Sequence, residues 1–141
     1  MKPSEIFFDK TISNRDKFGT YLKGRRIELG MSIRYFAHII NLTPAYISDI
    51  ENGNRLAPVK YLDKIIEILD IEEDEIQYFY DLAGCSHENW PDINTYLART
   101  PNARKALRLV RDKNIPAEEL FKFVTEMANE QESSPTEELE R

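Results

Sequence analysis

Cysteine is nearly absent from this 141-residue sequence, which contains only Cys85 and therefore cannot form an internal disulfide. Histidine is almost as scarce. Cys85, His87 and His38 are too few for a zinc site, which needs three or four ligands, and we expect no metal or other cofactor. No apolar run approaches the roughly 20 residues that span a bilayer, and the N-terminus lacks the apolar core of a signal peptide. These absences predict a soluble cytoplasmic protein that does not associate with membranes.

The signatures of an enzyme are missing as well. The sequence has no glycine-rich phosphate loop and no credible catalytic triad, and two histidines are too few for acid–base chemistry. We therefore predict that the protein is not an enzyme. Its length fits one domain, or one domain with a small companion, and a hydrophobic content of 41% is enough for a core.

Charge is distributed unevenly along the chain. The net charge of −6 argues at first against a nucleic-acid partner. Residues 15–60, however, contain eight basic and four acidic side chains, a net charge of +4, whereas residues 61–100 contain two basic and ten acidic side chains, a net charge of −8. A polyanion responds to the surface that it meets rather than to the sum over the chain. The N-terminal half is thus suited to face DNA, and the C-terminal half to face something else.

Two short amphipathic helices joined by a tight turn are predicted within residues 32–55. Ser32 is a good N-cap, and the apolar residues after it recur at helical spacing. Asn41 suits the left-handed conformation of a turn, and Thr43 followed by Pro44 provides the N-cap and first position of a second helix. A connection this short requires a steep crossing that leaves the second helix protruding, which is the helix-turn-helix unit.

These features resemble the lambda-repressor-like, XRE-type helix-turn-helix family over residues 18–71. The matching features are Leu29-Gly30, Ala37, Tyr46-Ile47-Ser48, and Ile50-Glu51-Asn52-Gly53 followed by Arg55 and Pro58. The resemblance implies an all-α fold, in which a five-helix DNA-binding domain is followed by a small C-terminal helical region. It also implies a partly buried ion pair between Arg26 and Glu51 that ties the first helix to the recognition helix. The alternative is an ordinary exposed pair.

We expect four segments along the chain: an N-terminal arm (1–14), the DNA-binding domain (15–82), a C-terminal helical region (83–129) and a disordered acidic tail (130–141). The apolar cluster of the arm, residues 6–8, should pack on the domain or on a subunit partner. Helices are predicted at residues 16–29, 59–69 and 72–82, with Ala83-Gly84 stopping the last one. The inner face of the first helix is expected to consist of Phe18, Leu22, Leu29, and Arg25 or Arg26.

The C-terminal region contains two predicted helices, residues 100–113 and 114–128, after a short helix that begins at Trp90-Pro91. Both have an apolar stripe, formed by Ala103, Ala106, Leu107 and Val110 and by Ala117, Leu120, Phe121, Val124 and Met127. We interpret these stripes as a homodimer interface, because helix-turn-helix proteins commonly bind DNA as dimers. The alternative is that they complete one larger helical domain.

Base reading is expected from the exposed start of the second motif helix, at Pro44, Ala45, Tyr46, Ser48 and Asp49. Family members often have glutamines early in the two motif helices, whereas this chain has Ile33, Pro44 and Ala45, which removes bidentate readers of adenine. Apolar contacts of Pro44 and Ala45 with thymine methyl groups remain, with a hydroxyl contact from Tyr46. Asp49 could accept from a cytosine amino group or repel phosphate, and DNA shape could add specificity.

Contacts with the DNA backbone are expected from Ser32, Ile33, Arg34, Thr43, Asn52, Asn54 and Arg55. The sequence thus predicts a transcriptional regulator that binds specific double-stranded DNA, a dimeric repressor reading the major groove with the helix at residues 43–52. Two alternatives use the same fold mainly to bind a protein partner. One is an antitoxin that neutralises another protein, and the other is a protein-interaction module that has lost DNA binding.

Overall fold

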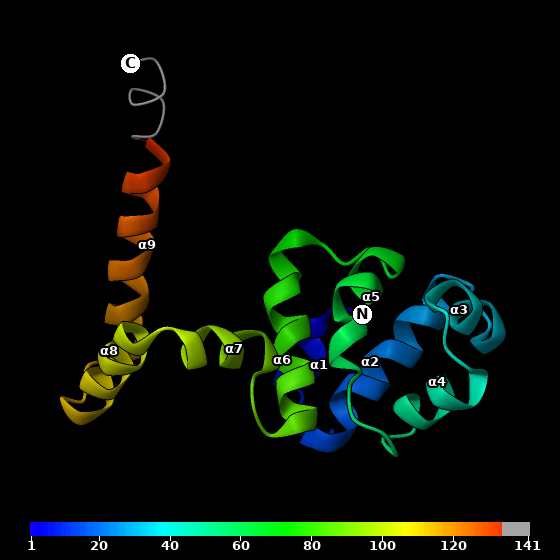
Figure 1. Cartoon of the computed structure of the whole chain (residues 1–141). Helices are drawn as coiled ribbons and strands as arrows, with labels where there is room; N and C mark the ends of the chain where they lie inside the picture. Colours follow the sequence, from blue (N-terminus) through cyan, green and yellow to red (C-terminus); the bar gives the residue numbers. More distant parts are fainter. Residues whose placement is uncertain (134–141) are drawn as a thin grey trace. The chain divides into compact units, whose positions relative to one another are not determined.

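The computed structural model describes residues 1–133, where all regular secondary structure is helical and no strand occurs. The predicted all-α fold is therefore confirmed. Contacts within the chain divide it into two units, one of residues 1–95 and one that begins at Tyr96. Figure 1 labels the helices in chain order.

The first unit contains the helix-turn-helix and the helices around it. Its elements are α1 (Pro3–Phe8), α2 (Asn14–Glu28), α3 (Ile33–Ile40), α4 (Pro44–Glu51), η1 (Val59–Tyr61), α5 (Leu62–Ile68), η2 (Glu73–Glu75), α6 (Ile76–His87) and the start of α7 (Pro91–Arg99). The helix predicted at 59–69 thus begins with the 3-10 turn η1. The helix predicted at 72–82 begins with the 3-10 turn η2.

Local capping explains where the motif helices begin. The hydroxyl of Ser32 accepts a hydrogen bond from the Tyr35 N–H (3.1 Å), and the hydroxyl of Thr43 accepts one from the Tyr46 N–H (3.1 Å). Each bond satisfies a backbone donor that has no partner inside its helix. Asn41 ends α3 in the left-handed conformation, with φ of 62°. The predicted caps and turn of the motif are confirmed.

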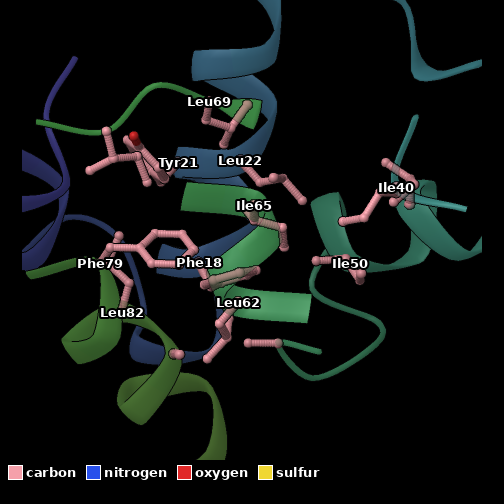
Figure 2. Packing of buried hydrophobic residues seen from close by; sticks show 14 of the residues in the cluster. Phe18, Tyr21, Leu22, Ile40, Ile50, Leu62, Ile65, Leu69, Phe79 and Leu82 are labelled. Carbon is pink, nitrogen blue, oxygen red and sulfur yellow. The ribbon is translucent and has the colours of Figure 1, made fainter. Parts of the chain in front are cut away.

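Helices α2 to α6 share one apolar core, part of which is shown in Figure 2. Helix α2 packs against α6 and α4, and α3 packs against α4. The rings of Phe18 on α2 and Phe79 on α6 meet with their centroids 5.4 Å apart. Burying such a side chain stabilises the fold by about 1.5–3 kcal/mol. The core also includes Tyr21, Leu22, Phe36, Ile40, Ile47, Ile50, Leu62, Ile65, Leu69 and Leu82.

The segment predicted as an N-terminal arm contains helix α1, which packs on α6 and α2. At its start, the Glu75 carboxylate accepts hydrogen bonds from the N–H of Ser4 (3.3 Å) and from the Ser4 hydroxyl. At its end, the Lys17 ammonium donates to the carbonyl of Phe7 (2.6 Å). A carboxylate at the start of a helix and a cation at its end both complement the helix dipole. The arm thus packs on the domain, which is one of the two predicted arrangements.

The prediction that Ala83-Gly84 stops a helix is wrong, because α6 continues to His87. A Cβ atom on Gly84 would lie only 2.8 Å from the indole ring of Trp90. The glycine therefore allows Trp90 to pack against α6, where the indole N–H also donates to the Asp81 carboxylate (2.8 Å). A contact glycine and a helix-ending glycine look alike in the sequence.

The inner face of α2 also differs from the prediction at two positions. Leu29 follows the last residue of α2 and is exposed, whereas Tyr21, which was not predicted to face inward, is buried. Burial raises the pKa of Tyr21 to about 12. Phe18, Leu22 and Arg26 face inward as predicted.

The second unit contains the end of α7, with α8 (Pro101–Asp112) and α9 (Ala117–Ser133). The three helices α7, α8 and α9 have no buried residue. The Arg104 guanidinium donates to the carbonyls of Leu97 (2.6 Å) and Ala98 (2.9 Å) at the end of α7. The large exposed hydrophobic side chains of this unit are Tyr96, Leu107, Leu109, Ile115, Phe121, Phe123, Val124 and Met127.

The predicted disordered tail began at residue 130, but α9 continues through Ser133. The helix therefore extends past Met127, the last residue of the apolar stripe. The rest of the predicted tail, residues 134–141, lies outside the described part of the chain.

Candidate nucleic-acid interface

Helix α4 is held on the domain by close backbone packing against α2. A Cβ atom on Gly19 would lie 2.3 Å from the carbonyl oxygen of Ile50 and 2.7 Å from that of Glu51. Only glycine allows the two helices to approach this closely without a shift of the backbone. On its inner side, α4 buries Ile47 and Ile50. Its other face is consequently presented outward in a fixed orientation.

Arg26 and Glu51 form a buried ion pair between α2 and α4. The Arg26 Nε lies 3.0 Å from Glu51 Oε2, and its Nη2 lies 2.8 Å from Oε1. The two residues are only 7% and 9% exposed, and the remaining guanidinium nitrogen Nη1 donates to the Met31 carbonyl (2.7 Å). The pair therefore links α2, the start of the motif and α4, rather than lying open to solvent.

The residues proposed to read bases lie along the outer side of α4. Pro44 and Ala45 are exposed at its start, and Tyr46, Ser48 and Asp49 are half-buried. The Ser48 hydroxyl accepts a hydrogen bond from the side-chain amide of Asn52 (3.4 Å), the residue that follows the end of α4. Ser48 and Asn52, which the sequence analysis assigned to base and backbone contact respectively, therefore lie together.

Arg55 stacks on Tyr46. The guanidinium carbon of Arg55 lies 4.3 Å from the centroid of the Tyr46 ring, a cation–π arrangement. A candidate backbone contact and a candidate base reader are thus packed as one unit.

The other candidate backbone contacts lie in two places. At the start of α3, Ser32 and Arg34 are exposed, and Ile33 is half-buried. Around α4, Thr43 is exposed before its first turn, and Asn54 is exposed after its last. Tyr35, which the sequence analysis did not single out, is also exposed on α3 and lies beside Arg34 in the chain. An exposed tyrosine inside an apolar stretch gave no signal in the periodicity.

The loop after α4 is fastened by side chains from two other helices. Arg15 at the start of α2 donates from Nε to the carbonyl of Gly53 (2.9 Å). At the end of α6, the Ser86 hydroxyl accepts from the Ala57 N–H (3.0 Å), and His87 Nε2 lies 2.7 Å from the Ala57 carbonyl oxygen. These three roles were not predicted from the sequence, because they depend on packing between residues that are 29, 30 and 38 positions apart.

A metal site and a membrane-spanning helix are both absent from the part of the chain that the structure describes. Within residues 1–133, no group of three or more histidine, cysteine or acidic side chains could hold a metal ion. No helix in this part of the chain is long and apolar enough to cross a membrane.

Comparison with known proteins identifies the family of the motif. Searches of curated proteins and of solved structures give no match. Residues 22–76 match a family model described as helix-turn-helix, and this range contains α3, α4 and α5. Arg15, Ser86 and His87 lie outside it. Residues 22–76 are therefore a helix-turn-helix domain of the XRE-type, lambda-repressor-like family, whose members are DNA-binding regulators.

Proposed function

We propose that this protein is a transcriptional regulator that binds specific DNA sequences by inserting the start of α4 into the major groove. The observation that carries the proposal is the geometry of α4. One side of this helix is fixed on α2 by Gly19 and by the Arg26–Glu51 pair, and the opposite side is exposed at Pro44 and Ala45. Base contacts need such rigid placement, because a side chain must reach a particular base edge.

The exposed start of α4 favours contacts with thymine. Ala45 and Pro44 offer apolar surface to a thymine methyl group, and the Tyr46 hydroxyl can add a hydrogen bond. Asp49 is suited to accept from a cytosine amino group, since its carboxylate would be repelled by phosphate. This set is small, so we expect the shape of the DNA to contribute to specificity.

The backbone contacts are proposed to flank α4 on both sides. Arg34 and the capped start of α3 would contact phosphate on one side, and Asn54 and Arg55 on the other. Ser32 and Thr43 already accept backbone hydrogen bonds, but each hydroxyl can still donate to a phosphate oxygen. The remaining proposed backbone contacts are Ile33 and Asn52.

We propose further that two copies associate through α8 and α9. These helices expose a set of large apolar side chains, including Phe121, which is 73% exposed, and a monomer would leave them in water. Their charges are complementary: α8 contains four basic residues and one acidic residue, and α9 contains one basic and five acidic residues. Packing α8 of one copy on α9 of the other would cover the apolar stripes and pair opposite charges twice in a symmetric dimer.

A dimer of this kind suits a cytoplasmic repressor. One recognition helix reads only a few base pairs, so two copies are needed to specify an operator. Bound at a promoter, a small dimer would exclude polymerase without further machinery.

The exposed apolar helices also support a second candidate function. In an antitoxin or a protein-interaction module, α8 and α9 would cover a different protein instead of a second copy, and α4 would contribute little to binding. Co-purification of one small protein at a fixed ratio, with loss of that protein when Phe121 is made polar, would favour this reading.

The proposal is tested by in vitro selection from random duplex DNA at about physiological salt with the full-length protein. We expect an enriched inverted repeat whose half-sites lie about one helical turn apart, which is the spacing expected of helix-turn-helix dimers. An enriched single half-site would retain sequence-specific binding but reject the dimer. No enrichment would reject the proposed function in favour of the protein-partner alternative.

A further inference from the structure

A cleft of about 720 Å³ lies beside the loop after α4, between the start of α2 and the end of α6. We propose that this cleft binds a phosphate group, supplied either by the DNA backbone or by a phosphorylated small molecule. In the first case the inference rests on the proposed function, because the phosphate belongs to the operator. In the second it does not.

The polar groups that line the cleft suit an anion. Arg15 and Arg55 contribute two guanidinium groups, and Asn14 and Asn54 contribute side-chain amides. Guanidinium groups bind phosphate oxygens with paired, charge-assisted hydrogen bonds. Glu88 is the one carboxylate among the lining residues, so the basic groups outnumber the acidic ones.

The walls of the cleft are held in place before any ligand arrives. Nε of Arg15 is bound to the Gly53 carbonyl, which leaves the two terminal nitrogens of this guanidinium with donors to offer. The other end of the loop is fixed by the bonds of Ala57 to Ser86 and His87. A preorganised site loses less conformational entropy on binding than a flexible loop would.

The remaining lining residues do not suggest different chemistry. Burial raises the pKa of the Cys85 thiol, so it stays protonated at neutral pH and is a poor nucleophile. Trp90 also lines the cleft, and its indole N–H is already bound to Asp81.

The position of the cleft connects it to the recognition helix. Arg55 contacts the cleft and also stacks on Tyr46, so a phosphate bound there would lie next to the surface proposed to read bases. Asn14, Arg15 and the end of α6 lie outside the matched range 22–76. Segments on both sides of the helix-turn-helix domain would therefore add to its contacts with the DNA backbone.

The test introduces a negative charge into the cleft without disturbing the fold. Asn14 is the first residue of α2, where an aspartate is favourable to the helix dipole, so Asn14→Asp should fold at least as well as the natural protein. The matched control is Gln77→Glu, which makes the same change of charge at an exposed position of α6 that does not line the cleft.

Two measurements separate the two sources of phosphate. The first is DNA affinity at several salt concentrations, where loss of one phosphate contact lowers the salt slope by about one. The second is a titration of the DNA-free protein with inorganic phosphate, followed by the amide resonances of residues 14–15, 53–55 and 84–87.

A lower slope for Asn14→Asp, with an unchanged slope for Gln77→Glu, would establish the cleft as a contact to the DNA backbone. Saturable shifts of the cleft amides by phosphate that vanish in Asn14→Asp, with unchanged slopes, would establish a site for a phosphorylated small molecule. Equal slopes and no saturable shifts would overturn the proposal. If the natural protein binds no duplex at all, the proposed function fails, and the phosphate titration still decides the cleft.

Discussion

The guanidinium group of Arg55 lies on the face of the Tyr46 ring, 4.3 Å from the guanidinium carbon to the ring centroid. Tyr46 is a candidate base reader, and Arg55 is a candidate backbone contact. Because the two side chains touch, a phosphate held by Arg55 would help to fix Tyr46 in the groove, and loss of the ring would loosen Arg55. Under the proposed function, base reading by Tyr46 and backbone contact by Arg55 would therefore be coupled.

Substitutions at these two positions should differ in their effect on salt dependence. Arg55→Ala should weaken binding to all DNA sequences and lower the salt slope by about one, because one phosphate contact is lost. Tyr46→Phe keeps the ring under Arg55 and removes only the hydroxyl, so its slope should match that of the natural protein. Binding isotherms on the selected operator and on random duplex test this pair. A reduced slope for Tyr46→Phe, or an unchanged slope for Arg55→Ala, would contradict the assignment.

The ion pair between Arg26 and Glu51 should be costly to break from one side. Arg26→Ala leaves the buried Glu51 carboxylate without a partner, and it should lower the free energy of unfolding by about 3–5 kcal/mol. The double variant Arg26→Leu with Glu51→Leu removes both charges and should recover much of that loss. Urea denaturation measures the free energy of unfolding of the single and the double variant. A loss below about 1 kcal/mol for Arg26→Ala would mean that the pair behaves like an exposed one.

Two glycines of α2 should respond oppositely to the same substitution. Gly19→Ala would place a Cβ atom 2.3 Å from the Ile50 carbonyl oxygen, so it should force α4 away from α2, reduce stability by at least about 1–3 kcal/mol and weaken DNA binding. Gly24→Ala meets only the flexible end of the Met1 side chain and removes a glycine from a helix interior. It should therefore stabilise the protein by up to about 1 kcal/mol.

Thermal unfolding and DNA affinity of the two alanine variants provide the comparison. Equal stabilities would show that α2 and α4 do not approach as closely as the structure indicates. A stable Gly19→Ala variant with natural DNA affinity would show that the placement of α4 does not matter for binding.

The helix-turn-helix was predictable because its signals are local. The starts of α3 and α4 are determined by the hydroxyls of Ser32 and Thr43, and the end of α3 by the left-handed Asn41. The spacing of the apolar residues determines which face of each helix is buried. The ion pair of Arg26 and Glu51 was available only through the resemblance to the family, since 25 residues separate its partners.

Features that depend on tertiary packing were not predictable in the same way. Gly84 looks like a helix stop, but it lies within α6, where the Trp90 ring packs against it. Arg15 contributes to the basic character of the N-terminal half, but its contact with Gly53 exists only once α2 and α4 are packed. The positions of the candidate base readers could be predicted from the motif, whereas the cleft beside them could be found only in the packed structure.

Association of two chains should depend on the apolar stripe of α9. Phe121→Gln removes the aromatic side chain of this stripe, which is 73% exposed, and should convert a dimer into a monomer. Lys122→Gln changes the adjacent residue, which lies outside the stripe, and should leave the dimer intact. Light scattering coupled to size-exclusion chromatography distinguishes the 16.5 kDa of one chain from twice that mass. A natural protein that is monomeric at micromolar concentration would reject the dimer outright.

Sequence-specific reading by the start of α4 is tested most directly by repeating the DNA selection with Ala45→Gln. Ala45 is exposed, and glutamine is a good helix former, so the variant should fold normally. Glutamine can bind adenine with two hydrogen bonds, and such a pair discriminates against other bases by about 1–3 kcal/mol. We expect the enriched sequence to gain an adenine at one position in each half-site and to stay otherwise unchanged. An enriched sequence identical to that of the natural protein would contradict base reading by α4.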